Sequence, residues 1–184
     1  MVAKRKNVRR YPGGQIAHAD RGETEAQILS IAKWQREKLG ASESNFRAHE
    51  WECPLGQLRM MDKCFPRQGQ GISARQHDAI KRYILGRAIY RASQGFPVEN
   101  PKSISAELVS RGIDLSRIDD DDETALRKRR DHNGARSALL SNPSNGCKWI
   151  NLVDALARDE PFNMRDIGDI RMAANELARH YGIP

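Results

Sequence analysis

The chain has 184 residues, 39% of them hydrophobic and 30% charged, with a mean hydropathy of −0.72. This composition suits a soluble protein of one domain or two small ones, and no apolar run approaches the roughly 18 residues that a membrane span needs. The formal net charge of +7 and the pI of about 9.6 favour a polyanionic partner, nucleic acid above all.

The cysteines are too few, and odd in number, for a secreted disulfide scaffold. They are Cys53, Cys64 and Cys147. The basic N-terminus is not followed by an apolar segment, so it does not have the pattern of a signal peptide. These features predict a cytoplasmic protein.

Residues 1–22 are the most basic segment of the chain. They hold six basic residues, one acidic residue and a Pro12-Gly13-Gly14 break, so we expect a flexible arm that is disordered by itself. Such arms neutralise phosphates and can lie in a minor groove. The candidate nucleic-acid contacts in the arm are Lys4, Arg5, Lys6, Arg9 and Arg10. The alternative is a tail that only increases solubility.

The remainder of the chain, residues 23–184, has helical periodicity. Its first helix is expected over residues 24–39, which begin with a capping box of Thr24 and Gln27. Apolar side chains recur there at helical spacing and give the helix one apolar face.

A shorter helix is expected over residues 54–64, because Pro54 suits a first helical position and apolar residues follow at helical spacing. Phe46 and Trp51, just before it, predict a short turn or helix packed on the core. This short helix, a loop and the long helix that follows resemble a helix-turn-helix in outline. The loop is too long for the tight turn of that motif, so plain core packing is the alternative.

The longest predicted helix covers residues 73–93. Ser73 and Gln76 form a capping box, and the helix should stop before Gly95. One apolar stripe is expected at Ile80, Tyr83, Ile84 and Ala88. A basic outer face is expected off that stripe, with candidate nucleic-acid contacts at Lys81, Arg82, Arg87 and Arg91.

Residues 94–103 form a linker with two prolines. The linker could divide the helical domain into subdomains 23–95 and 103–184. One or two helical turns are expected after it, over residues 105–111, and they should end at Gly112.

A helix is expected over residues 123–140, after the acidic run 119–123. A basic run near its start supplies further candidate nucleic-acid contacts: Arg127, Lys128, Arg129 and Arg130. Acidic residues that precede basic residues by a turn also stabilise a helix locally. Local ion pairing is therefore the alternative role of the basic run.

Two amphipathic helices are expected to close the chain, one around Trp149 that ends near Asp159 and one over residues 165–181. No segment has the pattern of a strand. The predicted class is all-α: a compact helical domain of about six helices, preceded by the basic arm.

No residue pattern predicts catalysis. His49, Cys53, Cys64 and His77 could be metal ligands in a suitable fold, but only His49 and Cys53 have the close spacing that structural zinc sites use. There is also no P-loop and no dinucleotide fingerprint. We therefore expect no enzymatic activity, no cofactor and no metal.

Five segments together resemble small proteins, of no assigned chemistry, that are encoded in alphaproteobacterial phages, prophages and gene-transfer clusters. The segments are RRYPGGQI, AHEWECPLGQLRMM, GISARQHDAIKRY, FPVENPKSIS and DIRMAANELARHYG. The resemblance covers most of the chain and implies a bacterial, phage-type protein with a regulatory role. It carries over no catalytic or binding residue.

The predicted function is that of a nucleic-acid-associated, phage-type transcription regulator, an activator or antiterminator that binds DNA, RNA polymerase or both. One alternative is a DNA-packaging accessory protein similar to a small terminase subunit, which should form oligomers. Another is a non-enzymatic protein-interaction module. Neither reading involves a membrane.

Overall fold

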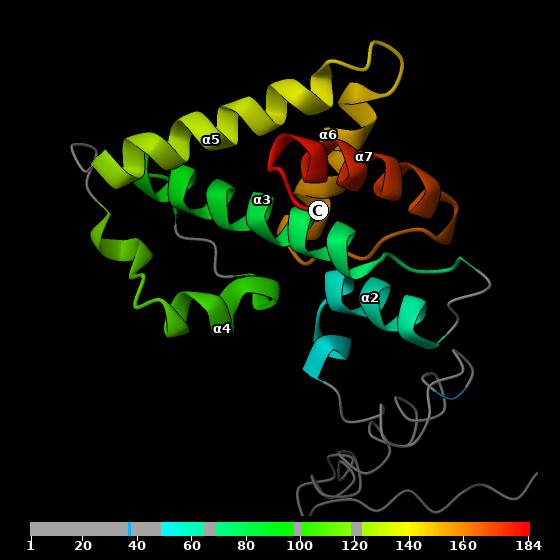
Figure 1. Ribbon diagram of the computed structural model, residues 1–184. Helices are drawn as coiled ribbons and strands as arrows, with labels where there is room; N and C mark the ends of the chain where they lie inside the picture. The colour runs from blue at the N-terminus through cyan, green and yellow to red at the C-terminus, as the bar shows by residue number, and fades with distance from the viewer. Residues whose placement is uncertain (1–36, 38–48, 65–68, 98–100, 119–122) are drawn as a thin grey trace, which may run out of the picture.

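Figure 1 shows the structure, a computed structural model in which residues 37, 49–64, 69–97, 101–118 and 123–184 are described. These ranges contain helices, turns and bends but no strand, which confirms the all-α class. The basic arm, Phe46, most of the helix expected over residues 24–39 and the acidic residues 119–122 lie outside them.

Helix α3, Ala74–Ser93, is the element that most of the other described helices contact. The predicted capping box is confirmed: Ser73 Oγ accepts from the Gln76 backbone N–H at 3.3 Å, and Gln76 Oε1 accepts from the Ser73 N–H at 2.9 Å. The predicted apolar stripe of α3 is buried. Helices α5 and α7 cover most of α3, and α2, α4 and α6 make smaller contacts with it.

Helix α2, Pro54–Cys64, follows the short 3-10 helix η2, His49–Glu52, and confirms the helix predicted to start at Pro54. Trp51 is buried against this region, as expected. The Ile72 N–H donates to the Leu58 carbonyl at 3.0 Å. This bond ties the segment before α3 to α2. Helix α2 ends at Cys64 and α3 begins at Ala74, which is too far along the chain for the three- or four-residue turn of a helix-turn-helix motif.

Helix α4, Lys102–Ser110, begins three residues earlier than the sequence predicts. The Lys102 N–H donates to the carboxylate of Asp159 at 2.8 Å, so a residue 57 positions away satisfies the first turn of the helix. The 3-10 helix η3, Leu115–Arg117, follows α4.

Helix α5, Glu123–Leu140, has the predicted bounds and lies along α3 in Figure 1. Arg129 contacts Ser93 at the end of α3, and Arg136 contacts Tyr83 near its middle, so the two helices are antiparallel. Helix α6, Gly146–Ala157, ends two residues before Asp159.

The chain closes with the 3-10 helix η4, Met164–Asp166, and helix α7, Ile167–His180, which together match the helix predicted over residues 165–181. One hydrophobic cluster includes residues from both sides of the predicted linker, among them Ile80 of α3, Ile104 of α4 and Leu177 of α7.

Two helical glycines give opposite expectations for the same substitution. A Cβ at Gly56 would overlap the backbone carbonyl of Glu50, whereas a Cβ at Gly168 would meet no heavy atom within 4 Å. We expect Gly56→Ala to lower the free energy of unfolding by about 2 kcal/mol through overpacking. Gly168→Ala should raise it by up to about 1 kcal/mol, because alanine loses less backbone entropy in a helix. Urea unfolding of both variants checks this, and equal effects would contradict the packing at Gly56.

Candidate nucleic-acid interface

The two longest described helices, α3 and α5, are also strongly basic. Helix α3 holds five basic residues and one acidic residue, and α5 holds five basic and two acidic residues. Helices α3 and α5 pack side by side and form one layer, which carries all the predicted contacts of the helical domain. Each predicted contact in the layer has its own surroundings.

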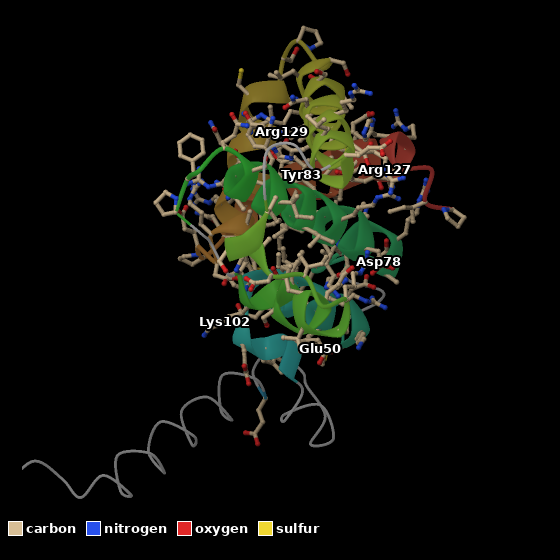
Figure 2. All side chains as sticks on the ribbon, turned by 90° about the vertical axis from the view of Figure 1, so that its left-hand side faces the viewer. Glu50, Asp78, Tyr83, Lys102, Arg127 and Arg129 are labelled. Atoms are coloured by element: carbon tan, nitrogen blue, oxygen red, sulfur yellow. The ribbon has the colours of Figure 1, made fainter. Side chains whose placement is uncertain are left out.

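Arg127 and Arg130 of α5 are exposed, and neither makes an ion pair with any residue that the structure describes. Figure 2 shows Arg127 and Arg129 on opposite sides of α5. Lys128 belongs to the same run, but its side chain is outside the described part of the chain. Among the described side chains of the run 127–130, Arg127 and Arg130 are therefore exposed and without a described ion-pair partner. Local ion pairing with the acidic run is not decided, because residues 119–122 lie outside the described part of the chain.

Arg129 has a structural contact instead. Its Nε donates to Ser93 Oγ at 2.7 Å, and its Nη2 donates to the Ser93 carbonyl at 2.8 Å. A cation at a helix C-terminus satisfies the terminal carbonyls and complements the negative end of the helix dipole. Arg129 therefore stabilises the end of α3, and part of the hydrogen-bonding capacity of its guanidinium is taken up by Ser93.

Lys81 and Arg82 line a hollow of about 950 Å³ between α3, α4, α5 and the C-terminal residues. Lys81 Nζ lies 3.3 Å from a carboxylate oxygen of Glu107. The Arg82 guanidinium lies over the ring of Tyr181, 4.6 Å from its centroid. The hollow is lined by three basic and three acidic side chains: Lys81, Arg82 and Arg111, with Asp78, Glu107 and Asp131. Its charge is balanced, so it does not favour a polyanion.

The prediction that Arg87 lies on the outer face of α3 is wrong. The residue is only 8% exposed, and its Nε lies 3.3 Å from Asp154 Oδ1. Helix α6 supplies Asp154 and covers this side of α3, which the periodicity of α3 alone does not reveal. Arg91 is half-buried, with its guanidinium 4.9 Å from the ring centroid of Phe96.

Asp154 is the centre of a polar cluster inside the helical domain. It accepts hydrogen bonds from the Tyr83 hydroxyl at 2.8 Å and from Arg136 Nη1 at 3.0 Å, in addition to the Arg87 contact. Burial, and then the Asp154 charge, raise the pKa of the Tyr83 hydroxyl. Figure 2 labels Tyr83 beneath α5. Neither Asp154 nor Arg136 is among the residues predicted from the sequence, because no local signal pairs them with α3.

His132 completes the cluster from α5 and is only 2% exposed. Its ring lies between two tyrosines, with centroid distances of 5.0 Å to Tyr83 and 5.1 Å to Tyr90. Its buried Nδ1 has no hydrogen-bond partner among the described residues. Burial, helped by the positive charge of Arg136, lowers the pKa of His132 to about 4, so the imidazole is neutral at pH 7.

The residues weighed as metal ligands do not form a site. Within the described ranges, no group of three or more His, Cys, Asp or Glu side chains is arranged to hold a metal ion. Cys53 is buried, and its Sγ accepts from the Gly56 N–H at 3.3 Å. The described helices include none with the length and apolar character to cross a bilayer.

No protein-family model, curated protein or solved structure matches this chain.

The low pKa of His132 predicts an acid-dependent loss of stability. Below pH 6.5 the unfolded chain binds a proton at this imidazole, but the folded chain does not until about pH 4. The free energy of unfolding should therefore fall as the pH falls through this window, by up to about 1.4 kcal/mol per pH unit from this group. His132→Phe keeps an aromatic ring between the tyrosines and removes the proton site.

Denaturant unfolding of both proteins between pH 7 and pH 4 is the measurement, and the variant should lose less stability than the wild type. Because carboxylates titrate in both proteins, the difference between the two curves isolates the imidazole. Parallel curves would show that His132 titrates normally in the folded protein.

Proposed function

We propose that this protein is a nucleic-acid-associated regulator of phage-type transcription that binds DNA, RNA polymerase or both. The observation that carries the proposal is the pairing of α3 with α5, two basic helices in contact, with Arg127 and Arg130 exposed on α5. The chain outside this pair adds the cations of the N-terminal arm, Lys4 to Arg10.

The physical basis of the proposal is phosphate neutralisation. Each cation that meets a phosphate releases condensed counterions, which gives affinity that is independent of base sequence and falls with salt. Arginine suits this role because its guanidinium can bind two phosphate oxygens at once. The arm would supply most of the affinity, and Arg127 and Arg130 would set the orientation of the domain on the nucleic acid.

Lys81, Arg82 and Arg129 are weaker candidates than Arg127 and Arg130. Each already contacts another part of the protein, and the hollow beside Lys81 and Arg82 carries balanced charge. A phosphate would have to compete with these internal contacts. We therefore assign the domain's part of the interface to the start of α5.

A salt series of duplex-DNA binding tests the proposal. If each of the five arm cations meets a phosphate, removal of residues 1–21 should flatten the slope of log affinity against log salt by about 4.5 units. Arg127→Gln combined with Arg130→Gln should flatten it by about two units. The matched control is Arg165→Gln with Arg179→Gln, which removes the same charge from two exposed arginines on η4 and α7.

Equal salt slopes for the two double variants would show that only net charge matters. In that case Arg127 and Arg130 of α5 do not contact the DNA. If binding is unchanged without residues 1–21, the N-terminal arm does not contact the DNA and only increases solubility. No binding by the intact protein at low salt would end the DNA proposal and leave a protein partner such as RNA polymerase. Light scattering separates the packaging alternative, because a ring-forming packaging protein would be oligomeric in the same buffer.

A further inference from the structure

The middle of α5 holds four consecutive residues with weak helix propensity: Asp131, His132, Asn133 and Gly134. Short polar side chains compete with the helical backbone for hydrogen bonds, and glycine loses the most backbone entropy in a helix. These residues lower the stability of α5 at its centre. Natural proteins keep such residues where a packing contact or a function requires them.

Three of the four residues have a contact in the fold that accounts for them. The ring of His132 is buried between two tyrosine rings of α3. A Cβ at Gly134 would lie 2.9 Å from Cε1 of His180, so glycine gives the α7 side chain its place. Asp131 is one of the three carboxylates that balance the cations of the 950 Å³ hollow.

Asn133 differs from its three neighbours. It is exposed, beside a second hollow of about 320 Å³ where α3, α5 and α6 meet, and its amide makes no hydrogen bond with a residue that the structure describes. Alanine would give a more stable helix at such a position. Packing within the described domain therefore does not account for Asn133, and the residue points to a contact with a partner.

Asn133 shares one exposed face of α5 with Arg130 and Ser137. Spacings of three and four residues place these side chains on the same side of a helix, and all three are exposed. The only acidic residue between positions 130 and 137 is Asp131, which lines the 950 Å³ hollow. Figure 1 shows α5 along the upper edge of the helical domain, with no described helix above it. The face therefore offers a guanidinium, an amide and a hydroxyl to a partner.

We propose that α5 enters the major groove of duplex DNA and that Asn133 reads an adenine there, an inference that rests on the proposed function. The major groove is about 12 Å wide and admits an α-helix. Adenine alone presents a hydrogen-bond donor and an acceptor side by side in that groove, N6–H and N7. The amide of Asn133 matches both, since its oxygen accepts from N6–H and its nitrogen donates to N7.

The charges of the face divide affinity from selectivity. Arg127 and Arg130 supply affinity for phosphates, which is independent of base sequence and falls with salt. Asn133 is uncharged and releases no counterions, so its contact adds selectivity without a change in the salt slope. The inference and the proposed function can therefore be tested separately on the same protein.

The first test is a selection of bound duplexes from a random DNA pool by the intact protein. Sequences with an adenine at one fixed position should be enriched. Replacement of that A·T pair by G·C should weaken wild-type binding about tenfold or more. Asn133→Ala should bind both duplexes equally and keep the wild-type salt slope. The variant should also unfold at the same or a higher urea concentration, because alanine favours the helix.

The second test removes one atom of the base. A duplex with 7-deazaadenine at the enriched position lacks the N7 acceptor but keeps N6–H, so wild-type binding should weaken roughly fivefold. Asn133→Ala should bind the two duplexes alike, because its contact with N7 is already lost. The matched control is Asn151→Ala on α6, which removes another exposed asparagine and should behave as the wild type in both tests.

A pool in which no base pair is enriched, although the protein binds duplex DNA with the expected salt slope, would overturn the inference and leave the proposed function standing. An enriched adenine that Asn133→Ala still distinguishes as well as the wild type would also overturn it, because another residue then makes the contact. Absence of binding to any duplex at low salt would end both the inference and the DNA part of the proposed function.

Discussion

The carboxylate of Asp154 is the contact on which the arrangement of α3, α5 and α6 depends. Helix α3 lies at the centre of the fold, yet it carries five basic residues, and one of them, Arg87, is inside. A buried guanidinium is tolerated only with a charged partner and satisfied hydrogen bonds. Asp154 gives Arg87 that partner, and the same carboxylate binds Tyr83 and Arg136. Loss of one partner of a buried pair typically costs about 3–5 kcal/mol, so α6 is held in register with both neighbours.

Polar contacts between distant segments also set where the helices begin and end. The carboxylate of Asp159 accepts from the first N–H of α4, and Arg129 of α5 donates to the end of α3. Arg171 of α7 donates through Nε to the Gly71 carbonyl at 2.6 Å, which holds the segment before α3. Each contact satisfies backbone groups that a helix or turn leaves open, and each joins two elements that pack together.

The cations of the α3–α5 layer divide according to what surrounds them. On one side Lys81 and Arg82 face acidic residues, and the charge of that hollow is balanced. On the α6 side Arg87 and Arg136 both contact the carboxylate of Asp154, and the buried ring of His132 lies beside Tyr83. At the start of α5, Arg127 and Arg130 face solvent. The basic residues of α3 and α5 thus include ion-paired, buried and exposed side chains. Net charge alone does not distinguish these three environments.

The sequence by itself determined the elements whose signals are local. The capping box at Ser73, the start of α2 at Pro54 and the bounds of α5 all follow from residues within a few positions of one another. The tertiary structure decided what depends on neighbours: the early start of α4, the burial of Arg87, and the meeting of Asp154, Arg136 and His132. Helical periodicity identifies an apolar stripe, but the width of the buried face is set by the helices that cover it. A charged residue at the edge of the stripe is buried only when a distant part of the chain supplies a partner of opposite charge. No local pattern in the sequence predicts that contact.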